Sequence, residues 1–174
     1  YKAGQEVSVL GVAKLARKRP FGVIFGAGKV GRGFLAQLLN RAGWDFSLID
    51  SHDKTVEKLQ MNDGWEIFNL ASGETERLKA CEIMSTSDDL SGVLGRADLI
   101  LTAMGADHLV QWAQSVRGPL CQRLSNGCID LILAENHPRP ATAVRDALLE
   151  GASAEEKDLI ESNLGIAQAQ VLRS

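Results

Sequence analysis

The sequence predicts a doubly wound α/β fold with a mainly parallel sheet and an inserted β-hairpin. A short apolar run at residues 22–25 leads into the glycine-rich turn FGAGKVG at 25–31. An amphipathic helical pattern follows the turn, and a second apolar run at 46–49 ends in Asp50. Strand, glycine turn, helix and strand in this order form a βαβ unit, which builds parallel sheets with helices on both faces.

The helix after the glycine turn is expected to bury one apolar face and to end at Gly43, because a helix C-terminus favours a left-handed residue. At helical spacing, the expected face consists of Phe34, Leu35, Leu38, Leu39 and Ala42.

Three glycines of the turn have separate tasks. Gly26 permits a tight turn out of the strand, Gly28 lets a pyrophosphate approach the backbone, and Gly31 allows the helix to pack closely on the strand. The N–H groups of the first helical turn, with the helix dipole behind them, attract phosphate. This is the Rossmann dinucleotide-binding pattern. The predicted cofactor contacts in the turn are Gly26, Ala27, Gly28, Lys29, Val30 and Gly31.

Asp50 ends the second apolar run about 20 residues after the turn, where a carboxylate can accept hydrogen bonds from the adenosine ribose. Its charge repels a 2′-phosphate, so the sequence favours NAD over NADP. His52 and Lys54 lie close enough in sequence to keep NADP open. The structural alternative is a βαβ unit with an empty glycine turn, because glycines also cluster in ordinary turns.

Composition narrows the class of protein. A chain of 174 residues with 45% hydrophobic content can form one domain with a full core. A net charge of −3 gives no reason to expect a nucleic-acid or membrane partner. No apolar stretch approaches the roughly 18 residues of a membrane span, and no signal peptide is recognised, so a cytoplasmic protein is expected. Three cysteines without zinc-site spacing predict no metal and are expected as small buried residues in a reducing compartment: Cys81, Cys121 and Cys128.

Residues 1–20 are expected to form a leader or linker, and residues 21–174 the NAD-binding domain. The segment 7–10 could form a short strand. A basic cluster before Pro20 favours a solvated linker over a targeting or phosphate-attracting arm; it consists of Lys14, Arg17, Lys18 and Arg19. Because the chain opens with Tyr1, we expect a processed or trimmed piece.

A hairpin is expected to interrupt the alternation of strands and helices. A helix over 53–61 is followed by the helix breaker Asn62-Asp63-Gly64. The segments 65–70 and 77–84 then have the composition of strands, and the residues at 71–74 supply a turn between them.

The second half of the chain returns to alternating helices and strands. We expect first a short helix capped by Ser87-Asp88-Asp89 and ended at Gly95, and then a strand at 97–102. A helix from Leu109 to Gly118-Pro119, with Trp112 in the core, and a strand at 128–134 should follow. The chain should then form a helix after Pro138 and Pro140, a helix that starts with the capping box Ser153–Glu156, and a last strand within 166–172.

Two strand ends supply further candidate residues. The strand at 97–102 runs into Ala103-Met104-Gly105, whose small residues suit the close passage of a ligand. The strand at 128–134 delivers Glu135-Asn136-His137 to the same edge of the sheet. These polar groups could orient a nicotinamide ribose or a substrate, or they could cap the next helix. His137 alone is not assigned as a base, because a base needs a partner within reach.

Three segments, in this order, resemble the N-terminal domain of the mannitol dehydrogenase family, the long-chain polyol dehydrogenases that include mannitol-1-phosphate 5-dehydrogenases. They are Phe25–Phe34 (FGAGKVGRGF), the Thr102–Gly105 turn and Ala134-Glu135-Asn136. The Gly73-Glu74-Thr75 turn fits the same pattern, and the resemblance covers residues 21–173.

The resemblance implies NAD-linked oxidation of a polyol or polyol phosphate to a ketose, and the reverse reduction. It also implies a second, mostly helical domain that carries the catalytic lysine and is absent from this chain, so no residue here is assigned as catalytic. The cofactor role extends to Asp50 and, beyond the turn, to Ala103, Gly105, Glu135 and Asn136, the last two near the nicotinamide end. A stand-alone NAD-binding regulatory module is the alternative.

Overall fold

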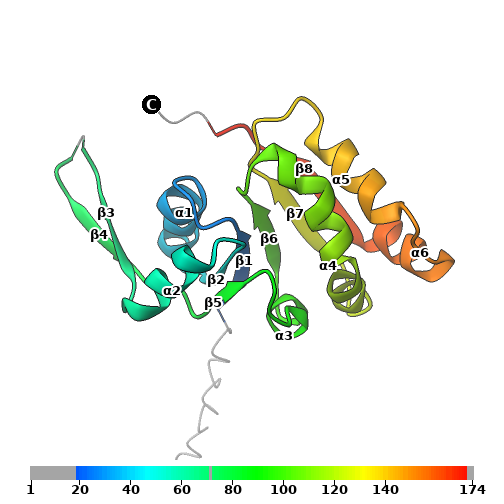
Figure 1. Cartoon of the computed structure of the whole chain (residues 1–174), viewed down its shortest axis with the longest axis horizontal. Coiled ribbons are helices and arrows are strands. Elements are labelled where there is room, and N and C mark those ends of the chain that lie inside the picture. Colours follow the sequence, from blue (N-terminus) through cyan, green and yellow to red (C-terminus); the bar gives the residue numbers. More distant parts are fainter. Residues whose placement is uncertain (1–18, 71, 172–174) are drawn as a thin grey trace, which may run out of the picture.

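The centre of the computed structural model is a six-stranded parallel sheet in the order β5-β2-β1-β6-β7-β8 (Figure 1). The structure describes residues 19–70 and 72–171. The strands are β1 (Phe21–Phe25), β2 (Asp45–Asp50), β5 (Ile83–Ser85), β6 (Leu99–Thr102), β7 (Ile129–Leu133) and β8 (Leu164–Gln168). Without the hairpin strands this order is 3-2-1-4-5-6, so the predicted doubly wound fold is confirmed. Such sheets bind ligands where the order reverses, here between β1 and β6.

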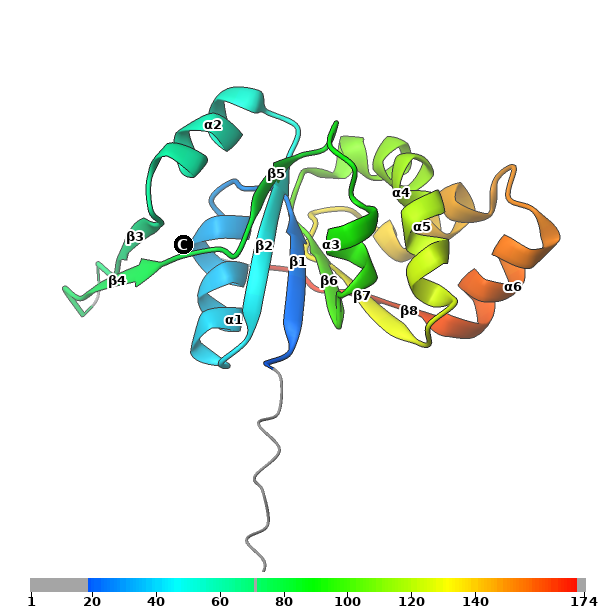
Figure 2. The same cartoon turned by 90° about the horizontal axis from the view of Figure 1, so that it is seen from below.

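Helices cover both faces of the sheet (Figure 2). Val23 and Phe25 of β1 point to one face and Ile24 to the other, as the alternation of a strand requires. The first face is covered by α3 (Ser91–Gly95), α4 (Leu109–Leu124), α5 (Pro140–Leu149) and α6 (Ala154–Asn163). The second face is covered by the π-helical turn η1 (Gly31–Leu35), α1 (Ala36–Arg41) and α2 (Asp53–Met61). A short 3₁₀ turn, η2 (Ala106–His108), leads into α4.

The apolar face predicted for the first helix is only partly right. Leu35 and Leu39 are buried, but Leu38 is 48% exposed and Ala42 is exposed as well. The reason is η1, in which the Leu35 N–H donates to the carbonyl five residues back instead of four. A π turn rotates the following residues around the helix axis, so regular α-helical spacing misplaces them. The predicted left-handed Gly43 is confirmed, with φ at +75°.

The hairpin consists of β3 (Trp65–Phe68) and β4 (Thr75–Leu78), which pair antiparallel outside the main sheet (Figure 1). The expected single strand at 77–84 is wrong. Its start belongs to β4, whose Leu78 is buried, and its end is β5, where Ile83 pairs with Leu48 of β2. The chain has to leave the hairpin before it can join the parallel sheet, and this divides the apolar run in two.

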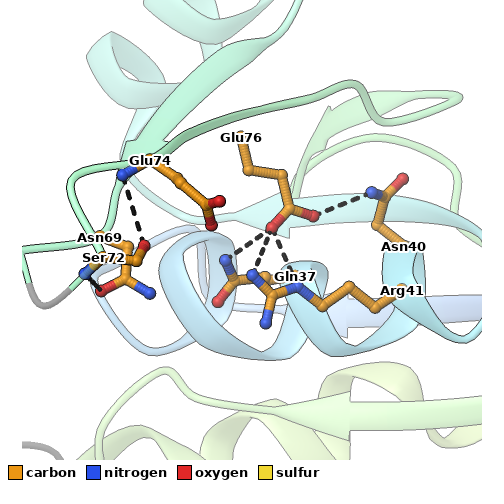
Figure 3. Close-up of polar contacts among 7 residues, drawn as sticks. All are labelled: Gln37, Asn40, Arg41, Asn69, Ser72, Glu74 and Glu76. Carbon is orange, nitrogen blue, oxygen red and sulfur yellow. Dashed lines mark hydrogen bonds and ion pairs between the residues drawn. The ribbon is translucent and has the colours of Figure 1, made fainter.

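One carboxylate fastens the hairpin to α1. Glu76 of β4 accepts hydrogen bonds from Gln37 Nε2 at 2.8 Å, from Asn40 Nδ2 at 3.1 Å and from the Arg41 guanidinium at 2.8 and 3.0 Å (Figure 3). These donors, Gln37 first, lower the pKa of Glu76. An isolated hairpin is at best marginally stable in water, so this attachment supplies part of what holds it.

The predicted stop at Gly118-Pro119 is wrong, because α4 continues through Pro119 to Leu124. An interior proline costs a helix about 3 kcal/mol through its missing N–H and its ring. The burial of a large apolar side chain contributes about 1.5–3 kcal/mol. The part of α4 beyond the proline buries Leu120, Cys121 and Leu124, which offsets that cost.

Most other elements agree with expectation. An exception is the expected cap of α3, whose N-cap residue is Leu90 without a side-chain cap, although Asp89 accepts the Ser91 N–H at 2.9 Å. Helix α2 spans the predicted 53–61, and α5 begins at Pro140. The capping box of α6 is confirmed, since Ser153 and Glu156 bond each other's backbone N–H groups. The last strand begins at Leu164, earlier than expected. The short strand expected at 7–10 and most of the basic cluster lie outside the described residues.

The cysteines depart from the expectation of burial. Cys121 is buried, and burial raises the pKa of its thiol, whereas Cys81 and Cys128 are exposed. All three are free thiols. In the part of the chain that the structure describes, no group of three His, Cys, Asp or Glu side chains is placed to hold a metal ion. Among the same residues, no helix has the length and apolar character to cross a bilayer.

Candidate functional site

The three glycines of the turn differ in the space around them. A Cβ on Gly31 would lie 1.7 Å from the Gly26 carbonyl oxygen, and one on Gly26 would lie 2.3 Å from the Ala103 oxygen. Gly26 also has φ at +99°. A Cβ on Gly28, in contrast, would meet no described atom within 4 Å. Gly26 and Gly31 are therefore required by close packing, whereas Gly28 presents open backbone to the crevice.

The turn leads into a helix, and its first amides precede the intrahelical hydrogen bonds. The first hydrogen bonds run from Arg32 N–H to the Gly28 carbonyl and from Gly33 N–H to the Lys29 carbonyl. Amides before the start of the ladder have no intrahelical acceptor, and this makes a helix N-terminus an anion site. The indole N–H of Trp65, on the hairpin, donates to the Arg32 carbonyl at 3.0 Å. The hairpin therefore supports the same helical turn.

Asp50 is bound to the glycine turn itself. One carboxylate oxygen accepts the Ala27 N–H at 2.6 Å and the other accepts the His52 N–H at 2.8 Å. The structure thus brings Asp50 next to the turn, as the sequence predicts. Each carboxylate oxygen has two acceptor sites, so both can accept a further hydrogen bond.

Two cavities open on either side of the strand ends. The first, of about 440 Å³, is bordered by Gly28, Asp50 and Trp112. The second, of about 350 Å³, is bordered by Val30 and Asn136. Ala103 lines both cavities, so the turn after β6 separates them.

The turn after β6 is held by a buried carboxylate. Glu135 is 7% exposed; its two oxygens accept the Met104 N–H at 2.8 Å and the Gly105 N–H at 3.0 Å. The Ala103 N–H donates to the Phe25 carbonyl at 2.7 Å. The structure therefore gathers Ala103, Gly105 and Glu135 at one sheet edge, as expected. It also gives the Glu135 carboxylate backbone partners that the sequence does not reveal.

His137 helps to shape the loop into α5. Its backbone N–H donates to the Glu135 carbonyl at 3.0 Å, and its Nδ1 accepts the Arg139 N–H at 3.1 Å. Arg139 is the N-cap residue of α5, which has no side-chain cap, so this contact shapes the loop before the helix and does not cap its first turn. Across residues 19–70 and 72–171, no carboxylate side chain is bonded to His137. Asn136 is left facing the second cavity.

Sequence reasoning missed the α4 side of the first cavity. Trp112 is 6% exposed and packs in the core as predicted, with its ring 5.2 Å from that of Phe25. It also lines the cavity together with His108, Gln111 and Ser115. These four positions share one helical face, and that spacing was the signal that could have found them.

The sequence matches a known protein family over most of its length. Residues 22–173 match the family described as the mannitol dehydrogenase Rossmann domain. Mannitol-1-phosphate 5-dehydrogenase of Clostridium acetobutylicum is 28% identical over 154 residues, which are 86% of this chain and 40% of that protein. The enzyme of the same name from Anoxybacillus flavithermus is 27% identical over 157 residues, 87% of this chain and 41% of that protein. The chain thus spans about 40% of the length of these relatives.

Solved structures show the same fold at low identity. A UDP-glucose dehydrogenase from Pyrobaculum islandicum superposes with a TM-score of 0.62 at 15% identity, over 94% of this chain and 38% of that one. An octopine dehydrogenase solved with NADH and agmatine gives 0.62 at 12% identity, over 84% and 34%. With the match over residues 22–173, the chain belongs to the mannitol dehydrogenase family, and the fold described above is its Rossmann domain.

Proposed function

We propose that this chain is the NAD-binding domain of an oxidoreductase that transfers a hydride between NAD(H) and a polyol or polyol phosphate. One observation carries the proposal. The open backbone face at Gly28 lies where the strand order reverses and borders a cavity that Asp50 also lines. In a protein with this strand order, that place is where a dinucleotide pyrophosphate meets the helix N-terminus.

The two cavities suit the two halves of a dinucleotide. On this proposal the adenosine occupies the cavity beside Asp50, where the carboxylate can accept ribose hydroxyls. The pyrophosphate crosses the turn over Gly28, and the nicotinamide half enters the cavity lined by Ala103 and Asn136. Bound NAD would supply the hydride acceptor, and the protein would hold and orient it.

Asp50 provides the experiment for cofactor choice. Its charge opposes a 2′-phosphate, so wild-type protein should bind NADH at least about tenfold more tightly than NADPH in calorimetric titrations. Asp50→Asn keeps an oxygen that can accept the Ala27 N–H but removes the charge, so the preference should narrow. Equal affinity of the wild type for NADH and NADPH would contradict the role given to Asp50.

The substrate part of the proposal comes from the relatives. They are named mannitol-1-phosphate 5-dehydrogenases, and the matched segment is about 40% of their length. We assign the acid–base chemistry to sequence outside this chain, so the 174 residues alone should bind NADH without oxidising mannitol 1-phosphate. A longer polypeptide containing them should oxidise mannitol 1-phosphate or mannitol with NAD. NADH binding without turnover by that polypeptide would favour the regulatory module instead.

A further inference from the structure

The peptide between Ala103 and Met104 is held from both sides. Its N–H donates to Glu135 at 2.8 Å. Its carbonyl oxygen, on Ala103, lies 2.3 Å from where a Cβ on Gly26 would be placed. The peptide is trans, so its N–H and C=O point in opposite directions. One rigid plane therefore connects Glu135, two residues after the end of β7, with Gly26 in the glycine turn.

The next peptide is fixed by the same carboxylate. Gly105 donates its N–H to the second oxygen of Glu135 at 3.0 Å, and it has φ at +99°, a conformation that favours glycine. Glu135 is 7% exposed, and no basic side chain among the described residues forms an ion pair with it. The buried charge is therefore solvated by these two backbone N–H groups, and a flipped peptide would turn a carbonyl toward it.

We propose that Glu135 is a positioning residue: its carboxylate fixes the 103–105 turn, and through the Ala103 carbonyl it sets the wall against which Gly26 packs. On this view Glu135 does not bind the dinucleotide directly. This inference rests on the proposed NAD-binding function, because it says how the wall between the two cavities is held ready for the cofactor.

Glu135→Gln separates positioning from direct binding. A glutamine keeps the size of the side chain, and its amide can still hydrogen-bond a ribose hydroxyl, so a direct ligand would tolerate the change. A carboxylate clamp, meaning a carboxylate that holds the Met104 and Gly105 amides in place, would not tolerate the change. One of its oxygens becomes an NH₂ group that faces a backbone N–H. The matched control is Glu74→Gln, the same change at an exposed residue of the hairpin turn.

The first measurement is amide hydrogen exchange in the ligand-free protein. In wild type, the Met104 and Gly105 amides should be protected. In Glu135→Gln at least one of them should exchange about tenfold faster or more, while the Ala103 amide, bonded to the Phe25 carbonyl, should be unchanged. Unprotected Met104 and Gly105 amides in wild type would overturn the inference without any variant, so a variant that fails to fold does not decide the matter.

The second measurement is calorimetric titration with NADH. Glu135→Gln should weaken binding by about tenfold or more, and Glu74→Gln should leave it within about twofold of wild type. NADH binding within about twofold of wild type by Glu135→Gln would overturn the positioning role. If wild type itself binds no NADH while its two amides are protected, the proposed function fails and the carboxylate clamp remains as a feature of the fold.

Discussion

Alanine substitutions at Gly31 and Gly28 should have opposite effects on stability. The methyl group of Gly31→Ala would lie 1.7 Å from the Gly26 carbonyl oxygen, so the Gly26 peptide would have to move. That peptide cannot move freely, because Gly26 itself packs within 2.3 Å, measured from its ideal Cβ, of the Ala103 oxygen. Overpacking of this kind costs about 1–3 kcal/mol.

Gly28→Ala meets no such obstacle. A Cβ there has no described atom within 4 Å, and Gly28 does not have a positive φ. Alanine at a compatible position stabilises by about 0.4–1 kcal/mol, chiefly because it restricts the unfolded chain. At about 2–4 °C per kcal/mol, the midpoint of thermal unfolding should fall by roughly 2–12 °C in Gly31→Ala and rise by roughly 1–4 °C in Gly28→Ala.

The same pair of variants tests cofactor binding. The methyl group of Gly28→Ala would occupy the space proposed for the pyrophosphate, so NADH binding should weaken by about tenfold or more although the fold is intact. Scanning calorimetry gives the unfolding midpoints and isothermal titration gives the affinities. The reasoning is refuted if Gly28→Ala binds NADH as wild type does, or if Gly31→Ala unfolds at the wild-type temperature.

Three further predictions concern the helices and the hairpin. Pro119→Ala restores an N–H for the Ser115 carbonyl and should raise the free energy of unfolding by about 1–3 kcal/mol in urea titrations. An unchanged free energy of unfolding would mean that α4 accommodates Pro119 without that cost. Trp65→Phe removes the indole N–H from the Arg32 carbonyl and should cost about 0.5–1.5 kcal/mol, measured in the same way, and an unchanged midpoint would count against that bond. Because the pKa of Glu76 is lowered on folding, its contribution is complete above the unfolded value of about 4.3 and is lost as the pH falls through the lower folded value. Wild type should therefore lose more stability than Glu76→Gln on acidification in pH-dependent thermal melts, and parallel curves would contradict this.

The βαβ unit could be predicted because its signals are local. Glycine turn, apolar runs and Asp50 occupy adjacent stretches of sequence, and their order alone indicates a parallel sheet with a crevice. The capping box at Ser153–Glu156 is local in the same sense, and it was correct.

Errors arose where a neighbour distant in sequence decides the outcome. Pro119 is a strong local signal for a helix end, but burial of residues beyond it extends α4. Leu38 is a local exception, because it was misplaced by the π turn just before it, which has no clear mark in sequence. The apolar run at 77–84 was divided because its end pairs with β2.

The candidate site shows the same division. The sequence identified the glycine turn, Asp50 and Glu135 as candidates, and the structure brings them to one edge of the sheet. It did not reveal that Glu135 bonds the amides of Met104 and Gly105, which lie 31 and 30 residues earlier. The role of the glycine turn, Asp50 and Glu135 in cofactor binding stays a prediction.

The most direct test of the central claim is a calorimetric titration of the wild-type chain with NADH at neutral pH. The account predicts one saturable site per chain with a dissociation constant below about 1 mM. No binding heat and no saturation at millimolar NADH would contradict it, and the glycine turn would then be a structural feature without a ligand.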